Sequence, residues 1–159
     1  MMQVIADQSH APLFAAFLDG RMPEPIELDL QRTRFIALVD VPEDRPATLD
    51  DILTVCALNR WTPHTCEATL ASSGAKRQKA TREYITAVFD FVFNHAGRSR
   101  LITHVAVDNE KSIAVQHMLG MKQEAVLRDH FGEDRNAVLF GLTKRDWLAG
   151  PWALQADEA

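Results

Sequence analysis

Short apolar runs with the two-residue period of strands alternate along this chain with segments that have the period of helices. The first run spans residues 2–6. An amphipathic segment at 9–20 follows it, which Ser9 is expected to cap and Gly20 to end. Strands and helices that succeed one another in this way pack as layers around one sheet. The pattern therefore indicates an α/β or α+β domain.

The remaining elements follow from the same periodicities and from the turn residues between them. Further strands are expected at 34–41, 52–61, 65–71, 100–107, 123–130 and 136–142, and further helices at 80–95, 110–119 and near 145–148. Strand–helix–strand units mixed with hairpins predict a mixed, mostly antiparallel sheet flanked by helices. No linker is long enough to divide the chain, so residues 1–159 are expected to form a single domain.

Composition and charge exclude several classes of protein. Of the 159 residues, 47% are hydrophobic and 25% are charged, as in an ordinary globular domain. Without an apolar run of about 18 residues or a basic and apolar leader, neither a membrane helix nor a secretory signal is expected. Two cysteines, Cys56 and Cys66, fit a reducing cytoplasm better than a disulfide framework. A net charge of −5 argues against a nucleic-acid partner, but it permits a local basic pocket for an anion.

A cationic segment, SSGAKRQKATREY, joins a predicted strand to a predicted helix. Its small residues, Ser73 and Gly74 among them, allow the backbone to turn closely. Four cationic side chains gather before and at the helix start: Lys76, Arg77, Lys79 and Arg82. A helix start already offers free N–H groups and the positive end of a dipole, so a phosphate-bearing ligand would offset the charge. A solvated basic turn is the alternative, and the segment alone does not decide between them.

Motifs for several other chemistries are missing from the sequence. There is no GxSxG nucleophile motif, no P-loop and no Rossmann fingerprint. His64 and Cys66 are close in sequence, but no second pair at ligand spacing follows, so no metal site is expected. His104 alternates with Ile102 and Ala106 on its strand, so it faces either a cleft or the core.

A series of characteristic positions marks the second half of the chain. They are Asn109 after a strand, Ser112 three positions later, Leu119-Gly120 at a helix end, Glu124 and Arg128 in the next strand, and Trp147 after the last strand. On these positions the segment 66–147 resembles the GNAT superfamily of acyl-CoA-dependent N-acetyltransferases. It looks most like the branch of ribosomal-protein N-terminal acetyltransferases and short phage-encoded members. Met121 stands where the family usually has Phe, and Ala125 where it usually has Gly.

The resemblance implies that the cationic segment binds the pyrophosphate of acetyl-CoA. The family signature is Gln/Arg-x-x-Gly-x-Gly/Ala, and neither register of this segment restores its glycines. Either the cationic side chains hold the same phosphates, which is the favoured interpretation, or the bulkier residues weaken or abolish binding. The implied cofactor-binding residues are Ser73, Gly74, Lys76, Arg77, Lys79, Ala80, Thr81, Asn109 and Ser112.

The resemblance places the reaction in a gap between the strands at 65–71 and 100–107. An amine must lose a proton to attack a thioester, so a base is needed. Glu67 is the first candidate and His104 the second; an outward strand carboxylate and a hydrogen-bonded core histidine are the alternatives. The leaving thiolate needs an acid, which in much of the family is a Tyr. Gln116 stands at that position, and it can hydrogen-bond but not release a proton, so an ordered water or the amine itself would replace the acid.

The activity implied is transfer of an acetyl group from acetyl-CoA to a primary amine by direct attack in a ternary complex. The acceptor is either a protein N-terminus or a small amine. Because the phosphate segment and the Tyr position depart from the family, the alternative is a GNAT-fold protein that has lost turnover and binds an acyl-CoA or a partner protein. No membrane or nucleic-acid partner is expected, and a homodimer is left open.

Overall fold

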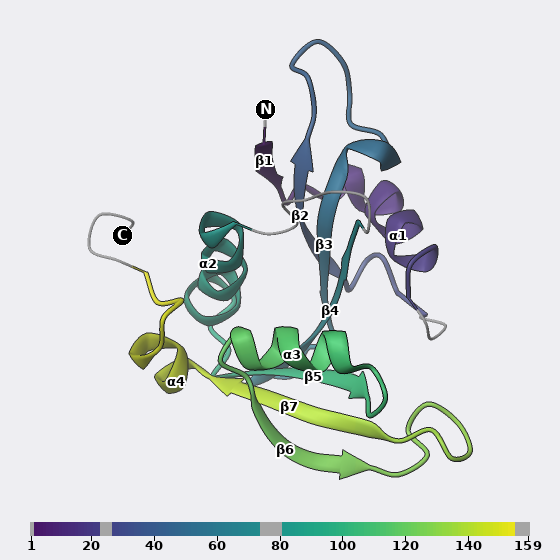
Figure 1. Cartoon of the computed structure of the whole chain (residues 1–159). Helices are drawn as coiled ribbons and strands as arrows, with labels where there is room; N and C mark the ends of the chain where they lie inside the picture. Colours follow the sequence, from purple (N-terminus) through teal and green to yellow (C-terminus); the bar gives the residue numbers. More distant parts are fainter. Residues whose placement is uncertain (1, 23–26, 74–80, 155–159) are drawn as a thin grey trace. The chain divides into compact units, whose positions relative to one another are not determined.

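The computed structural model describes residues 2–22, 27–73 and 81–154 (Figure 1). The chain forms two compact units. The first comprises Met1–Trp61 and Ala68–Val88, and the second comprises Thr62–Glu67 and Phe89–Ala159. Each unit has its own set of buried apolar side chains. The single domain expected over residues 1–159 stays a prediction.

Seven strands form a mixed sheet in the order β1-β2-β3-β4-β5-β7-β6. They are β1 (Met2–Ile5), β2 (Arg34–Asp40), β3 (Ile52–Asn59), β4 (Thr65–Ser72), β5 (Arg100–Ala106), β6 (Lys122–Leu127) and β7 (Ala137–Thr143). The β4–β5 pair is parallel, whereas β1–β2, β2–β3, β5–β7 and β6–β7 are antiparallel. The predicted mixed and mostly antiparallel sheet is therefore confirmed, as is the order of its strands along the chain.

The helices also follow the predicted order. They are α1 (Ala11–Asp19), α2 (Arg82–Asp90), α3 (Glu110–Met118) and α4 (Lys144–Ala149). A π-helical turn, Phe91–His95, continues α2, so the helix expected over 80–95 changes its hydrogen-bonding pattern in its last five residues. The prediction that Ser9 caps α1 is wrong. Ser9 lies inside a 3-10 turn that precedes α1, and Asp7 caps that turn by accepting hydrogen bonds from His10 N and Ser9 Oγ.

The first unit packs a helix against each face of its strands. Phe14 and Phe17 of α1 lie fully buried with Phe35 of β2 in one apolar cluster. Ile36, next along β2, points to the opposite face, where the hydroxyl of Tyr84 from α2 donates a hydrogen bond of 2.6 Å to its carbonyl oxygen. Burial raises the pKa of the Tyr84 phenol well above its ordinary value. Helices on both faces explain why β2 and β3 are buried along almost their whole length.

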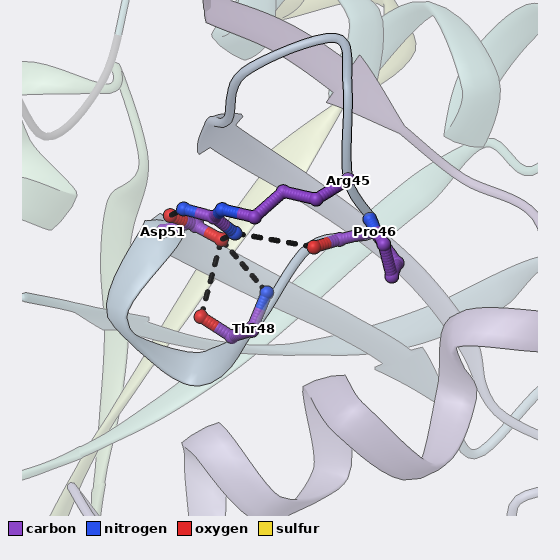
Figure 2. A network of polar contacts seen from close by, with 4 residues as sticks. All are labelled: Arg45, Pro46, Thr48 and Asp51. Atoms are coloured by element: carbon purple, nitrogen blue, oxygen red, sulfur yellow. Dashed lines mark hydrogen bonds and ion pairs between the residues drawn. The ribbon is translucent and has the colours of Figure 1, made fainter.

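An ion pair closes the loop between β2 and β3 (Figure 2). The buried carboxylate of Asp51 accepts hydrogen bonds from both terminal nitrogens of Arg45, at 2.7 and 2.9 Å. The same carboxylate accepts from the backbone N and the hydroxyl of Thr48, at 2.8 and 3.1 Å. The guanidinium of Arg45, followed by the donors of Thr48, holds the pKa of Asp51 well below its ordinary value. The loop therefore depends on an ionised carboxylate.

Replacing Asp51 by Asn is expected to lower the melting temperature at pH 7 by about 2–4 °C. A carboxyl whose pKa falls on folding stabilises the protein above its unfolded pKa of about 4, and this stabilisation is lost as the pH drops through the folded value. The difference in melting temperature between the two proteins should therefore be widest at neutral pH and should narrow below about pH 4. Circular dichroism melts across this range measure it. Asp50→Asn is the control, since Asp50 is exposed in the same turn; an equal difference at pH 7 and pH 3 would contradict the account.

The second unit is built on the β5–β7–β6 strands. Asn109 caps the N-terminus of α3, because its side-chain oxygen accepts from Ser112 N. A left-handed glycine, Gly120 at φ +84°, follows the end of the helix. The ring of Phe93 stacks on the fully buried Trp147 of α4, with 5.3 Å between centroids. The indole N–H of Trp147 donates 2.8 Å to Trp152 O, which fixes the chain after α4.

The hairpin between β6 and β7 departs from the prediction. The strand expected over 123–130 ends at Leu127, because the chain turns at Asp129, a non-glycine residue with a positive φ of 55°. Its backbone N donates 3.0 Å to Asn136 Oδ1, and its own carboxylate accepts 2.9 Å from Asp134 N. The residues after Leu127 therefore form an ordered turn rather than the end of a strand.

None of the helices among the described residues combines the length and the apolar character needed to cross a bilayer.

Candidate active site

The first two predicted catalytic residues, Glu67 and His104, lie against each other in the second unit. β4 pairs with β5 in parallel, so that Glu67 stands opposite Ile102. His104 is two residues beyond Ile102 and points to the same face of the sheet. Its Nδ1 lies 2.6 Å from Glu67 Oε1, and the two side chains are only 16% and 19% exposed. Register alone thus brings a carboxylate and an imidazole together in a half-buried position.

The hydrogen bond fixes which nitrogen of His104 carries a proton. An ionised carboxylate only accepts, so Nδ1 donates to Glu67. Nε2, at the far edge of the ring, is then the basic nitrogen. Among the residues that the structure describes, Nε2 has no hydrogen-bond partner. A carboxylate behind an imidazole in this way is the arrangement in which a histidine accepts a proton from a substrate.

A third group at this position escaped the sequence analysis. His130, from the β6–β7 turn, stacks on the ring of His104 with 4.5 Å between centroids and 21° between planes. Phe131 meets His130 edge-on, at 4.9 Å. His130 is exposed, and its place next to His104 is not evident from the sequence. No local signal could have found it, because its contact depends on how the hairpin turns.

The third predicted catalytic residue, Gln116, lies on the other face of β5. It is buried on α3, and its Oε1 accepts 2.8 Å from the hydroxyl of Thr103. Thr103 and His104 are adjacent in the strand and therefore point to opposite faces. The structure thus brings Glu67 and His104 together and holds Gln116 apart from them. The catalytic role predicted for these residues stays a prediction.

An ion pair borders the Glu67–His104 pair on the same face of the sheet. Arg100 Nη2 lies 2.5 Å from Glu124 Oε1, and Arg100 lowers the pKa of the Glu124 carboxyl. The pair lies directly over Gly141, where an added Cβ would stand 1.8 Å from Glu124 Oε1. Glu124 itself occupies the point in β6 where the register with β7 shifts. The bulge and the glycine together let two charged side chains lie flat on this face.

No protein-family model matches the sequence, and no curated protein matches it. Solved structures, in contrast, are similar over almost the whole chain. A variant of spermidine N-acetyltransferase SpeG from Vibrio cholerae has a TM-score of 0.71 at 14% identity, covering 92% of this chain and 96% of its own. Ribosomal-protein-S5-alanine acetyltransferase from Vibrio fischeri has a TM-score of 0.68 at 15% identity, covering 92% and 94%. The chain has the GNAT fold.

The GNAT fold confirms the fold implied by the sequence resemblance. A third similar structure, spermidine N-acetyltransferase from Vibrio cholerae in complex with CoA and spermine, has a TM-score of 0.67 at 14% identity and covers 92% of this chain and 98% of its own. Identities this low establish the fold and leave activity, cofactor and substrate to be proposed. The branch of short phage-encoded members likewise stays a prediction.

In the GNAT fold of this chain, the predicted cofactor residues fall in three places. Ser73 is buried and its N donates 2.8 Å to Leu53 O. Thr81 caps α2, because its hydroxyl and carbonyl oxygens accept from Tyr84 N and Ile85 N. Asn109 and Ser112 form the first turn of α3, joined by a 3.2 Å hydrogen bond. The other five lie outside the described residues: Gly74, Lys76, Arg77, Lys79 and Ala80.

Cysteine and metal chemistry find no support at this site. Cys66 precedes Glu67 on β4 and is fully buried, and burial raises the pKa of its thiol to about 12. A neutral, enclosed thiol is a poor nucleophile. Over the described ranges 2–22, 27–73 and 81–154, no group of three or more His, Cys, Asp or Glu side chains could hold a metal ion.

Proposed function

We propose that this chain is an N-acetyltransferase that moves the acetyl group of acetyl-CoA to a primary amine, with the Glu67–His104 pair as its base. The observation that carries the proposal is the 2.6 Å contact between His104 Nδ1 and Glu67 Oε1 in a chain with the GNAT fold. The contact leaves Nε2 of His104 as the proton acceptor. An amine needs such an acceptor, because its ammonium form has no lone pair with which to attack.

Acetyl-CoA would supply the thioester whose carbonyl carbon receives the amine nitrogen and whose C–S bond then breaks. His104 Nε2 takes a proton from the ammonium form of the acceptor, which leaves a neutral amine that can attack. As the new C–N bond forms, the amine nitrogen gives up a second proton. The carboxylate of Glu67 stabilises the charged imidazolium through the Nδ1 hydrogen bond. Gln116 cannot supply the proton that the leaving thiolate needs. The second proton of the amine nitrogen reaches the thiolate directly or through water. The imidazolium of His104 then returns its proton to water, so the base is restored for the next turnover.

The described part of the predicted cofactor site fits a phosphate-bearing ligand. Thr81 Oγ1 accepts from Tyr84 N at 3.1 Å, which leaves the hydroxyl proton free to be donated. The residue stands at the N-terminus of α2, a nine-residue helix whose dipole favours an anion. Asn109 and Ser112 lie at the start of a second helix, α3. The side-chain N–H groups of Asn109 and the hydroxyl of Ser112 can bind the polar arm of the cofactor. Each helix start, taken by itself, offers groups suited to a part of acetyl-CoA, and the cations of the segment before Thr81 are suited to its phosphates.

The cofactor assignment is tested by replacing Lys76, Arg77 and Lys79 together by Ala. Loss of three charges beside a pyrophosphate is expected to weaken CoA binding by about 10-fold or more, as measured by titration calorimetry. Binding of a pantetheine analogue without phosphates should change less than about twofold. Equal weakening of both ligands would contradict a phosphate role for these residues. Replacing Lys144 and Arg145 by Ala removes cationic charge from α4, a different helix, and is the control.

The acceptor is proposed to be a primary amine, either at a protein N-terminus or in a small molecule. Spermidine and the alanine of a ribosomal protein, named for the similar structures, both present an amine. Release of CoA thiol in a panel of polyamines, arylamines and N-terminal peptides tests the proposal, with mass spectrometry of the product. Acetylation of at least one amine is the expected result. A protein that binds acetyl-CoA but acetylates none of them supports the alternative, a GNAT-fold protein without turnover, which the buried Gln116 at the family's Tyr position favours.

A further inference from the structure

We propose that His130 is a positioning residue, which holds the ring of His104 so that Nδ1 stays on Glu67 and Nε2 stays directed at the acceptor amine. The inference deepens the proposed function and rests on it for its catalytic consequence. Its structural part, the orientation of the His104 ring, stands independently. The evidence is the stack of the two imidazoles together with the architecture of the turn that presents His130.

The ring of His104 needs a second restraint besides Glu67. A hydrogen bond to Nδ1 alone fixes one point, and the ring can still swing about that point or turn over about its Cβ–Cγ bond. A ring lying face to face at 4.5 Å and 21° blocks these motions, because either one would drive the His104 ring into the second ring. Glu67 and His130 thus restrain the imidazole from its edge and from its face.

The geometry also shows what His130 does not do. The N–H groups and lone pairs of an imidazole lie in the plane of its ring. Two rings stacked face to face therefore cannot pass a proton directly between them. His130 acts on His104 through shape and contact, as any flat aromatic ring of similar size would. The proposal therefore predicts that an apolar aromatic side chain can replace it.

The conformation of the β6–β7 turn places the side chain of His130 against His104. Asp129, immediately before His130, adopts a left-handed conformation at φ +55°, which is costly for a residue other than glycine. Two hydrogen bonds hold it there, from Asp129 N to Asn136 Oδ1 and from Asp134 N to Asp129 Oδ1. A third joins Phe131 N to Arg135 O at 3.0 Å. The ring of Phe131 also contacts His130, in an edge-on arrangement.

The kinetic test compares His130→Ala with His130→Phe. In His130→Ala the ring of His104 loses its second restraint. We therefore expect kcat for acetyl transfer to fall about five- to tenfold, with KM for acetyl-CoA changed less than about twofold. His130→Phe retains the stack and should keep at least about half of the kcat of the unaltered protein. His95→Ala, an exposed histidine on the π-helical turn, is the control. If His130→Phe loses as much activity as His130→Ala, or if His130→Ala loses none, the proposal is overturned.

A second readout needs no acetyl transfer. Long-range 1H–15N NMR spectra of the imidazoles report which nitrogen of His104 is protonated. The unaltered protein and His130→Phe should each show one state with the proton on Nδ1. His130→Ala should show a mixture of states. An unchanged His104 signal in His130→Ala would overturn the proposal. If the expected spectra appear but no protein acetylates any amine, the positioning role stands and the proposed function fails.

Discussion

Replacing His104 by Gln is expected to lower kcat for acetyl transfer by about 10²–10⁴-fold. Gln has nearly the length of His and can still hydrogen-bond to Glu67, but it has no nitrogen that accepts a proton at neutral pH. The half-buried setting of the pair, 16% and 19% exposed, keeps bulk water from substituting freely for the base. Thiol release at saturating amine and acetyl-CoA measures the loss.

The matched control for this substitution is His95→Gln. His95 belongs to the same unit, is 67% exposed and pairs with Asp90 at 3.0 Å, so it shares the chemistry of His104 without its place on the sheet. Its kcat should stay within about twofold of the unaltered protein. A His104→Gln protein with the same kcat as the control would remove His104 from the mechanism.

Replacing Trp147 by Ala is expected to destabilise the protein by about 3–5 kcal/mol. The indole is fully buried, stacks on Phe93 and donates a hydrogen bond to Trp152 O. Its removal leaves a cavity beside α4 and frees the chain after that helix. The free energy of unfolding from urea titrations measures the loss.

Trp147→Phe separates the contribution of the stack on Phe93 from that of the indole hydrogen bond. Phe keeps the stack on Phe93 and loses only the N–H donor and part of the volume, so a smaller loss of about 1–2 kcal/mol is expected. If both variants unfold at the same urea concentration as the unaltered protein, the second unit does not depend on this side chain. A loss in Trp147→Phe equal to that in Trp147→Ala would show that the stack on Phe93 contributes nothing measurable to the stability.

The arrangement of elements could be predicted well because local periodicity and turn residues dictate it. Alternation predicted the strand at 100–107, which the structure has as β5 over Arg100–Ala106. A capping residue, Asp108 or Asn109, and a glycine after the helix predicted α3, and the structure has Asn109 as the cap. Two of the predicted element boundaries were wrong, because a local interaction set the structure there. Ser9 lies in a 3-10 turn that Asp7 caps, so α1 begins after His10 instead, and Asp129 ends β6 early by turning the chain in a left-handed conformation. Which residue caps a turn or ends a strand depends on which side chains lie close to the backbone once the chain is folded, and sequence spacing does not reveal this.

Individual residues of the candidate site could be selected from the sequence, but the contacts between them could not be predicted. Glu67 and His104 could be selected because each sits on a strand of the expected sheet, but their 2.6 Å contact depends on the register between β4 and β5. His130 lies 26 positions after His104 and reaches it through a turn whose shape no pattern encodes. The role of Arg45 is similar, since the ion pair with Asp51 forms only when the β2–β3 loop closes.

The central claim is that Glu67 and His104 act as one base, and a double-variant cycle tests it most directly. The kcat for thiol release is compared among Glu67→Gln, His104→Gln and the protein carrying both changes. If Glu67 works only through the imidazole, the double variant should be no slower than His104→Gln by more than about threefold. Losses that multiply, as two residues acting separately would give, contradict the claim.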